Sequence, residues 1–148
     1  MNAREKRDRW KQLQRDLPTL ATEVLVETKA SFIDLNVDQL KKGERSGGGK
    51  IGRYKNPNGS YAKRKFRQNP AAGQGNVDLI NLGDWSEKLD IDVEGRRFKE
   101  LSRDDKDTML TTNYGADIYG LQPNNLKAYR RDEYMPLLRR KAAKITNG

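Results

Sequence analysis

The fold is decided largely by residues 10–35, which read WKQLQRDLPTLATEVLVETKASFIDL. One set of side chains recurs there at spacings of three and four residues, the repeat of an amphipathic α-helix. The set is Leu13, Leu17, Leu20, Val24, Thr28, Phe32 and Leu35. Pro18 has no amide donor and clashes with the preceding turn, so the sequence predicts a helix that begins afresh near Pro18, behind a separate basic arm at residues 1–17. The helical region is then residues 18–43.

Asn36 and Gln39 stand three residues apart, the spacing of a helix cap and its reciprocal partner. They predict a short second helix that ends at Gly43. Residues 44–76 follow as a long basic loop rich in glycine and proline. Residues 60–66 lack helix breakers, so we expect a short helical piece there. A loop of this length is typically functional, or disordered until a partner binds.

The apolar repeat changes from helical to alternating after residue 76. Val77 and Leu79 alternate with polar residues, and so do residues 88–93 and 96–101, as in half-buried strands. Glu94 and Gly95 between the last two segments predict a hairpin turn.

The rest of the chain predicts helix, extended backbone and helix. Residues 104–110 indicate a short helix or turn with Ser102 as its cap, and residues 114–121 a last strand or extended segment. Residues 126–141 have helical spacing that Pro136 kinks or divides. The fold predicted is one α+β domain over residues 1–148, in which long N-terminal and C-terminal helices pack on a small antiparallel sheet. Its β-rich core is residues 77–121, and its C-terminal helix and tail are residues 122–148.

The composition excludes most catalytic sites. The chain has 148 residues with no His and no Cys, which removes the commonest general base, the commonest transition-metal ligand and every disulfide. Only 34% of the residues are hydrophobic and 34% are charged, so the core is small and part of the stability is expected from neighbouring copies or another protein. No segment has the apolar length of a membrane span or signal peptide. We therefore expect a binding or assembly protein, not an enzyme.

The net charge of +9 is distributed unevenly. Residues 41–67 carry ten basic side chains against one acidic, whereas residues 76–107 carry six basic against ten acidic. Basic segments that flank an acidic middle suit a polyanion such as DNA, or another copy of the chain that meets positive patch to negative patch.

Three phrases occur in a fixed order along the chain. The first is YAKRK at residues 61–65, the second is VDLINLGDW at residues 77–85, and the third is YGADIYGL at residues 114–121. A fourth, DLNVDQL at residues 34–40, precedes the basic loop. Together they resemble the neck or tail-completion proteins of tailed phages, the family that includes virion morphogenesis proteins, in a variant like those of gut Bacteroidetes and crAss-like phages. Leu82 stands where that family usually has Thr before the glycine, so a capping hydroxyl is lost.

The resemblance implies a β-meander between the helices and a ring-forming structural protein at the portal vertex, which joins the DNA-filled head to the tail. It implies a homo-oligomeric ring of the portal's symmetry that contacts the portal, other neck or tail proteins and the packaged DNA. Such a protein is made in the host bacterial cytoplasm and resides in the virion. We expect no cofactor, no metal, no membrane and no small-molecule substrate.

Three groups of carboxylates and glycines give weaker indications of a catalytic, metal-binding or phosphate-binding site. Paired carboxylates for hydrolysis or Mg²⁺ are offered by Asp78, Asp84, Glu87, Asp90 and Asp92. Asp90 and Asp92, however, alternate with apolar residues and are expected on the solvent-exposed face of a strand. Asp104, Asp105 and Asp107 lack the ligand spacing of a calcium loop and are read as surface or interface charge. The glycines at residues 47–49 lack the full spacing of a phosphate-binding loop.

Aromatic and basic side chains are the candidate partner-binding residues. The aromatic ones can stack on nucleobases or anchor a protein interface, and the resemblance favours the interface. Trp85 is expected in the core or at a subunit contact. The alternative to a neck protein is a free DNA- or RNA-binding protein. The candidates are Lys50, Arg53, Tyr54, Tyr61, Lys63, Arg64, Lys65, Phe66, Arg67, Trp85, Tyr114, Tyr119, Arg130 and Arg131.

Overall fold

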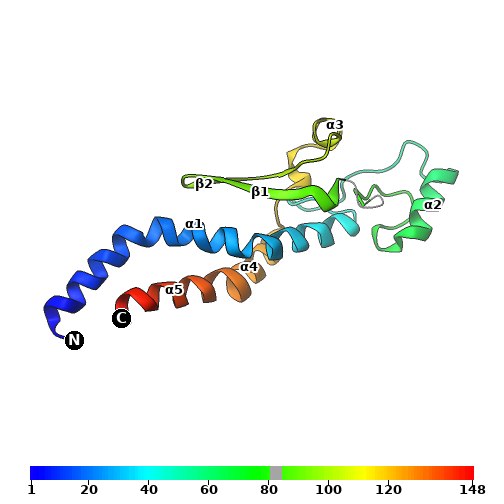
Figure 1. Ribbon diagram of the computed structural model, residues 1–148. Coiled ribbons are helices and arrows are strands. Elements are labelled where there is room, and N and C mark those ends of the chain that lie inside the picture. Colours follow the sequence, from blue (N-terminus) through cyan, green and yellow to red (C-terminus); the bar gives the residue numbers. More distant parts are fainter. Residues whose placement is uncertain (81–84) are drawn as a thin grey trace.

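The structure, a computed structural model, describes residues 1–80 and 85–148 and has an α+β fold (Figure 1). Its helices and strands are, in chain order, α1 (Ala3–Lys41), α2 (Ser60–Gln68), β1 (Leu89–Glu94), β2 (Arg97–Ser102), α3 (Asp107–Tyr114), α4 (Pro123–Tyr129) and α5 (Met135–Asn147). Helices α1 and α5 lie side by side, the hairpin of β1 and β2 runs along α1, and α2 lies at the end of the molecule away from the two termini. No helix of the described residues is both long and apolar enough to cross a bilayer.

Helix α1 runs through Pro18 without a break, so the predicted separate arm at residues 1–17 is wrong. The helix starts instead at a capping box, in which the Asn2 side chain accepts from the Glu5 amide at 2.9 Å and the Glu5 carboxylate accepts from the Asn2 amide at 2.9 Å. Pro18 removes one hydrogen bond from a helix of 39 residues, and the ribbon bends in its first half (Figure 1). The cap and the remaining bonds outweigh that loss.

Asn36 is not a helix cap but a fully buried residue inside α1. Its Nδ2 donates to the carbonyls of Ile118 and Gly120 at 3.2 and 2.9 Å. Gln39 donates from Nε2 to Gly120 at 3.0 Å and accepts from the Gln122 amide at 2.8 Å. The predicted end of the helical region at Gly43 is confirmed, because α1 stops at Lys41 and Gly43 has φ +69°.

The expected extended segment at residues 114–121 is also wrong. Tyr114 ends α3, and Ala116–Ile118 form a 3₁₀ turn. Gly115 and Gly120 have φ near +90°, which a strand does not contain, and the carbonyls of Ile118 and Gly120 bond to the side-chain amides of α1 instead of a sheet.

The predicted hairpin is confirmed. β1 and β2 pair antiparallel in a register that sets Leu89 opposite Ser102 and Glu94 opposite Arg97. They are the only strands of the described residues, so the β-rich core expected at residues 77–121 and the meander implied by the resemblance are reduced to this hairpin. Val77 and Leu79 are buried without being in a strand, since only Asn76 makes a bridge, to Arg53. Ile91 of β1 packs in one cluster with Phe32 of α1 and Tyr129 of α4.

Proline and serine place the remaining helix ends. Pro136 divides the C-terminal helix as predicted: a π-helical turn at Arg130–Tyr134 separates α4 from α5, and the Met135 amide bonds to the Arg130 carbonyl five residues back. The wider turn fits the proline ring, which would clash with a carbonyl in a regular α-helix. The short helix expected at residues 104–110 is α3, which begins later and has no side-chain cap. Ser102 Oγ donates to the Trp85 carbonyl at 2.7 Å and accepts from the Asp104 amide at 3.3 Å, ahead of the helix.

Glu100 of β2 completes the polar cluster around Gly120. Its Oε2 accepts from the Gly120 amide at 2.6 Å, whereas its Oε1 has no hydrogen-bond partner in the described part of the chain. Burial raises the pKa of this carboxyl to about 7, and the bond from Gly120 only partly opposes that rise. The folded chain therefore holds a proton on Glu100 at pH values where an exposed glutamate is ionised.

We expect the free energy of unfolding to fall as the pH rises from about 5 to 8, because the unfolded chain releases this proton near the ordinary glutamate pKa. The stabilisation is complete below the unfolded pKa and is lost as the pH passes the folded one, a difference of about 3 kcal/mol. Glu100→Gln should flatten that slope and exposed Glu94→Gln should keep it, as measured by urea unfolding at several pH values. An unchanged slope in Glu100→Gln would contradict the assignment.

Candidate assembly surfaces

The basic loop at residues 44–76 is tied to the core at several points. Its two isolated bridges join Glu44 to Lys50 and Arg53 to Asn76. The guanidinium of Arg45 donates to the carbonyls of Ile51 and Tyr114 at 3.2 and 2.7 Å. The expected helical piece is present as α2. The loop therefore has a defined path that presents α2 at one end of the molecule.

Lys65 faces inward from α2, unlike the other cations of that helix. Its Nζ lies 2.6 Å from Asp78 Oδ1, both side chains are buried, and Nζ also donates to the Ile80 carbonyl. Asn69 bonds to Asp78 at 2.9 Å and to the Lys41 carbonyl at 2.7 Å. This predicted partner-binding residue is thus engaged inside the chain, where it fixes α2 against the end of α1.

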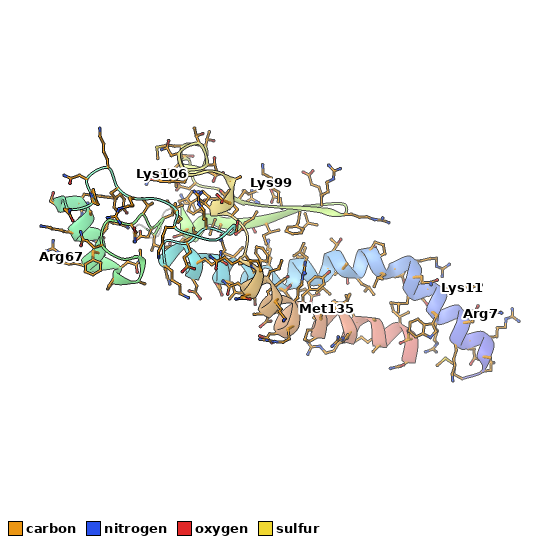
Figure 2. The ribbon with its side chains drawn as sticks, turned by 180° about the vertical axis from the view of Figure 1, so that it is seen from behind. Arg7, Lys11, Arg67, Lys99, Lys106 and Met135 are labelled. Carbon is orange, nitrogen blue, oxygen red and sulfur yellow. The ribbon has the colours of Figure 1, made fainter. Side chains whose placement is uncertain are left out.

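The outer face of α2 carries aromatic and cationic side chains. Tyr61 packs edge-on against Tyr54 with ring centroids 5.2 Å apart, and the Arg64 guanidinium lies 5.1 Å from the Tyr61 ring centre. Tyr61 is 49% and Phe66 38% exposed. Burial is the largest of the causes that raise the pKa of Tyr54 above its ordinary value. Lys63 and Arg67 are exposed on the same helix, and Arg67 lies at the tip of the molecule (Figure 2).

The glycine run at residues 47–49 is an exposed turn. Gly48 and Gly49 have positive φ, and the chain continues through Lys50 into an isolated bridge instead of a helix. Lys50 Nζ donates to the Lys42 carbonyl at 2.8 Å, and Arg53 bonds to Asn76 at 3.3 Å. A phosphate-binding loop leads directly into a helix N-terminus, and this one does not.

The three aromatic candidates nearest the hairpin belong to the interior. Trp85 is 3% exposed and donates from Nε1 to Asp107 at 2.9 Å. Tyr119 stacks beside Trp85 at 5.6 Å and donates its hydroxyl to the same carboxylate. Tyr114 packs on this core cluster. These residues stabilise the junction of α3 and the hairpin, which is the core role expected for Trp85.

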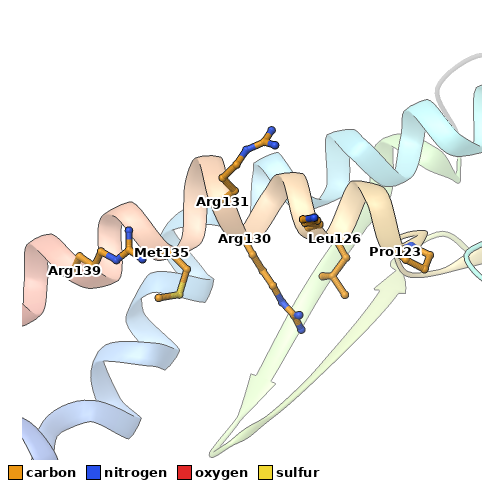
Figure 3. Close-up of a pocket in the computed structure, with 7 residues that line it drawn as sticks. Pro123, Leu126, Arg130, Arg131, Met135 and Arg139 are labelled. Atoms are coloured by element: carbon orange, nitrogen blue, oxygen red, sulfur yellow. The ribbon is translucent and has the colours of Figure 1, made fainter.

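Arg130 and Arg131 line a groove of about 580 Å³ along α4 and α5 (Figure 3). Its other lining residues are Pro123, Leu126, Lys127, Met135 and Arg139. The groove thus combines four cations with an apolar floor and contains no acidic side chain. Arg131 is paired with Asp132 at 2.7 Å, whereas no ion pair of Lys127, Arg130 or Arg139 is found within residues 1–80 and 85–148.

The π-helical turn makes this groove continuous. In a regular α-helix, positions 127, 131, 135 and 139 drift progressively around the axis. The turn at Arg130–Tyr134 contains about one extra residue and sets that rotation back by roughly 100°. Met135 and Arg139 are thereby brought into line with Lys127 and Arg131. The four-residue spacing of these side chains is visible in the sequence, but Lys127 and Arg139 are not among the predicted partner-binding residues.

The candidates therefore separate into three groups. Those on α2 and its loop lie at one end, Arg130 and Arg131 lie in the groove, and Trp85, Tyr114 and Tyr119 lie in or against the core.

A second groove of about 600 Å³ lies between α1, α4 and the hairpin, where Leu17 and Phe98 are exposed and Arg130 contributes a wall.

Two carboxylates of β1, Asp90 and Asp92, are bound by cations of the same chain. Asp90 is 2.8 Å from Lys29 Nζ and 3.1 Å from Arg103, which also reaches Asp92 at 2.5 Å. The hydrogen bond from Lys29 is the main cause that lowers the pKa of Asp90 to about 2. No group of carboxylates that would hold a metal is found in the described part of the chain. Asp84 and Leu82 lie outside the described residues.

A scan of protein-family models and searches of curated proteins and of solved structures find no match to this chain.

We expect Lys65→Met to lower the free energy of unfolding by about 3 kcal/mol, because it leaves the Asp78 carboxylate buried without its cation. Lys63→Met, on the exposed side of the same helix, should cost less than about 0.5 kcal/mol. The double variant Lys65→Met, Asp78→Leu should recover much of the loss, since no charge then remains buried. Equal effects of the two single lysine variants in urea unfolding would contradict the buried pair.

Proposed function

We propose that this chain is a structural subunit of a tailed-phage virion, a ring-forming protein of the neck between portal and tail. It acts by protein–protein assembly and catalyses no reaction. Its partners are further copies of itself, the portal, and other neck or tail proteins, with the packaged DNA in contact range. Its place is then the portal vertex of the virion, after synthesis in the host cytoplasm.

The observation that carries this proposal is the way the chain spreads its binding side chains over an extended molecule. Large apolar side chains remain exposed on several elements. They include Trp10 and Leu17 on α1, Tyr61 and Phe66 on α2, Phe98 on β2 and Met109 on α3. A monomer gains nothing from leaving these areas in water, whereas a subunit that contacts neighbours on several sides buries them.

Order in the sequence supports the same proposal. The four phrases that resemble the neck family fall on the end of α1, on α2, on the segment that leads to the hairpin, and on the segment between α3 and α4. The basic loop that links the first two phrases is fixed at its base by Lys65 and Arg45 and presents cations and Tyr61 outward. Tyr and Arg are the residues that dominate binding energy at protein interfaces.

Mixing the purified chain with the portal protein of its own phage tests this function. We expect co-sedimentation, and we expect Tyr61→Ser, Arg64→Glu to weaken it by about tenfold because the pair forms one exposed stack on α2. Lys144→Glu, an exposed charge near the C-terminus, serves as the control that leaves binding unchanged. A map of the assembled particle should place the chain at the portal vertex.

A nucleic-acid-binding protein is the second candidate. The specific observation for it is the basic outer face of α2, where Lys63, Arg64 and Arg67 surround an exposed tyrosine that can stack on a base. This candidate expects binding to DNA or RNA that weakens steeply as the salt concentration rises. Salt-sensitive binding together with a compact monomer that ignores the portal would favour it over the neck protein.

A further inference from the structure

The groove on α4 and α5 has the chemistry of a site for an acidic amphipathic helix. Pro123, Leu126 and Met135 line it together with four cations, of which Arg130 and Arg131 project to opposite sides of the helix (Figure 3). Lys127 and Arg139 are twelve residues apart, which corresponds to about 18 Å of helix. A nucleic-acid phosphate backbone would pair with the cations but would leave the apolar floor without a contact. A helix with carboxylates beside small apolar side chains can pair with the cations and also pack on the floor.

Helix α1 has a surface of that kind. Its acidic stripe consists of Glu23, Glu27, Asp34 and Asp38, whose spacings of four, seven and four residues place them on one face. All four side chains are exposed. Its two ends, Glu23 and Asp38, are fifteen residues apart, about 22 Å of helix, which is comparable to the length of the groove.

Apolar side chains border the acidic stripe. Val26 is 48% exposed, and Ala30 is exposed one turn further along the helix. Within residues 1–80 and 85–148, neither Asp34 nor Asp38 takes part in an ion pair. The end of the stripe near Gly43 is thus charged, exposed and without a cation of its own.

The same stripe already attracts a cation of α5 within one chain. Lys141 Nζ lies 2.8 Å from Glu27 and 3.5 Å from Glu23, and these two carboxylates remain about half exposed. Lys141 of α5 therefore pairs with the carboxylates at one end of the stripe within the same chain. A contact between the groove of one molecule and the stripe of another would repeat this pairing of an α5 cation with an α1 carboxylate.

We propose that the acidic stripe of one copy docks into the cationic groove of a second copy, and that this contact is the subunit interface of the assembly. The proposal rests on the proposed function, because it names the surfaces through which that protein self-associates. Such a contact joins two different patches, so repetition of it around an axis generates a ring, or a filament if the rotation does not close.

Reversal of charge on each surface tests the pairing in the full-length chain. The groove variant is Lys127→Glu, Arg139→Glu, the stripe variant is Asp34→Lys, Asp38→Lys, and a third variant carries all four substitutions. We expect each pair of substitutions to weaken self-association by at least about tenfold, and the fourfold variant to return it close to the wild-type value. Sedimentation equilibrium at low ionic strength measures this, after circular dichroism has shown unchanged helix content.

The matched control is Lys11→Glu, Arg15→Glu, which reverses two exposed charges in the first half of α1 and should leave self-association unchanged. A wild-type chain that stays monomeric at every concentration overturns the proposal, and so does a fourfold variant that fails to recover. If the groove variant loses salt-dependent DNA binding while its self-association persists, the groove binds nucleic acid and the pairing is wrong.

The two proposals fail separately. Rings that bind the portal but ignore both charge reversals retain the neck function and refute this interface. Self-association that follows the charges, in a chain absent from the portal vertex, retains the interface and refutes the neck function.

Discussion

The structure depends on two side-chain amides near the end of α1. Asn36 and Gln39 bond to the backbone of residues 118–122, a segment with no sheet partner for its carbonyls. Buried carbonyls without partners are costly, so this segment can pass through the core only where such donors exist. The helix thereby fixes the path of the chain from α3 into α4. Tyr129 of α4 is in turn placed against Phe32, and the hairpin is held over both.

A second buried polar contact, the ion pair of Lys65 and Asp78, fixes the position of α2 in the basic loop. Lys65 and Asp78 are charged groups in a buried position, and they orient α2 so that its other cations face outward. A purely apolar anchor would hold the helix with less directional preference than this pair, to which Asn69 and the Ile80 carbonyl also bond. The exposed Tyr61 and Arg64 owe their common orientation to two residues that are themselves buried.

Local patterns predict the hairpin, the helical stop at Gly43, the α2 helix and the division at Pro136, since each depends on neighbours in the sequence. The errors at Asn36 and at residues 114–121 have one physical origin, which is contact between distant segments, whereas the helix passes Pro18 because a capping box at Asn2 and Glu5 starts it earlier. Asn36 has the sequence signature of a cap, and only the carbonyls more than eighty residues away make it a core residue. Lys65 is likewise indistinguishable from Lys63 in the sequence until Asp78 is placed beside it.

Composition and charge identify where the candidate surfaces lie but not how they are shaped. The polarity between residues 41–67 and 76–107 is real along the chain, yet Lys29 and Arg103 neutralise much of the acidic hairpin in the fold. The acidic stripe on α1 consists of exposed carboxylates that are too far apart in the sequence to form an acidic run. Its regularity appears only once α1 is known to continue unbroken through the whole region.

The π-helical turn has a consequence for how this chain tolerates change. The turn contains about one extra residue, which changes the direction in which the side chains of α5 point relative to those of α4. Pro136 favours this wider turn over a regular α-helical one. With a residue that permits an ordinary α-helical turn at that position, the helix is free to rewind, and Met135 and Arg139 would rotate about a quarter turn away from Lys127. An uncharged proline thus governs whether the cations of two helices act as one surface.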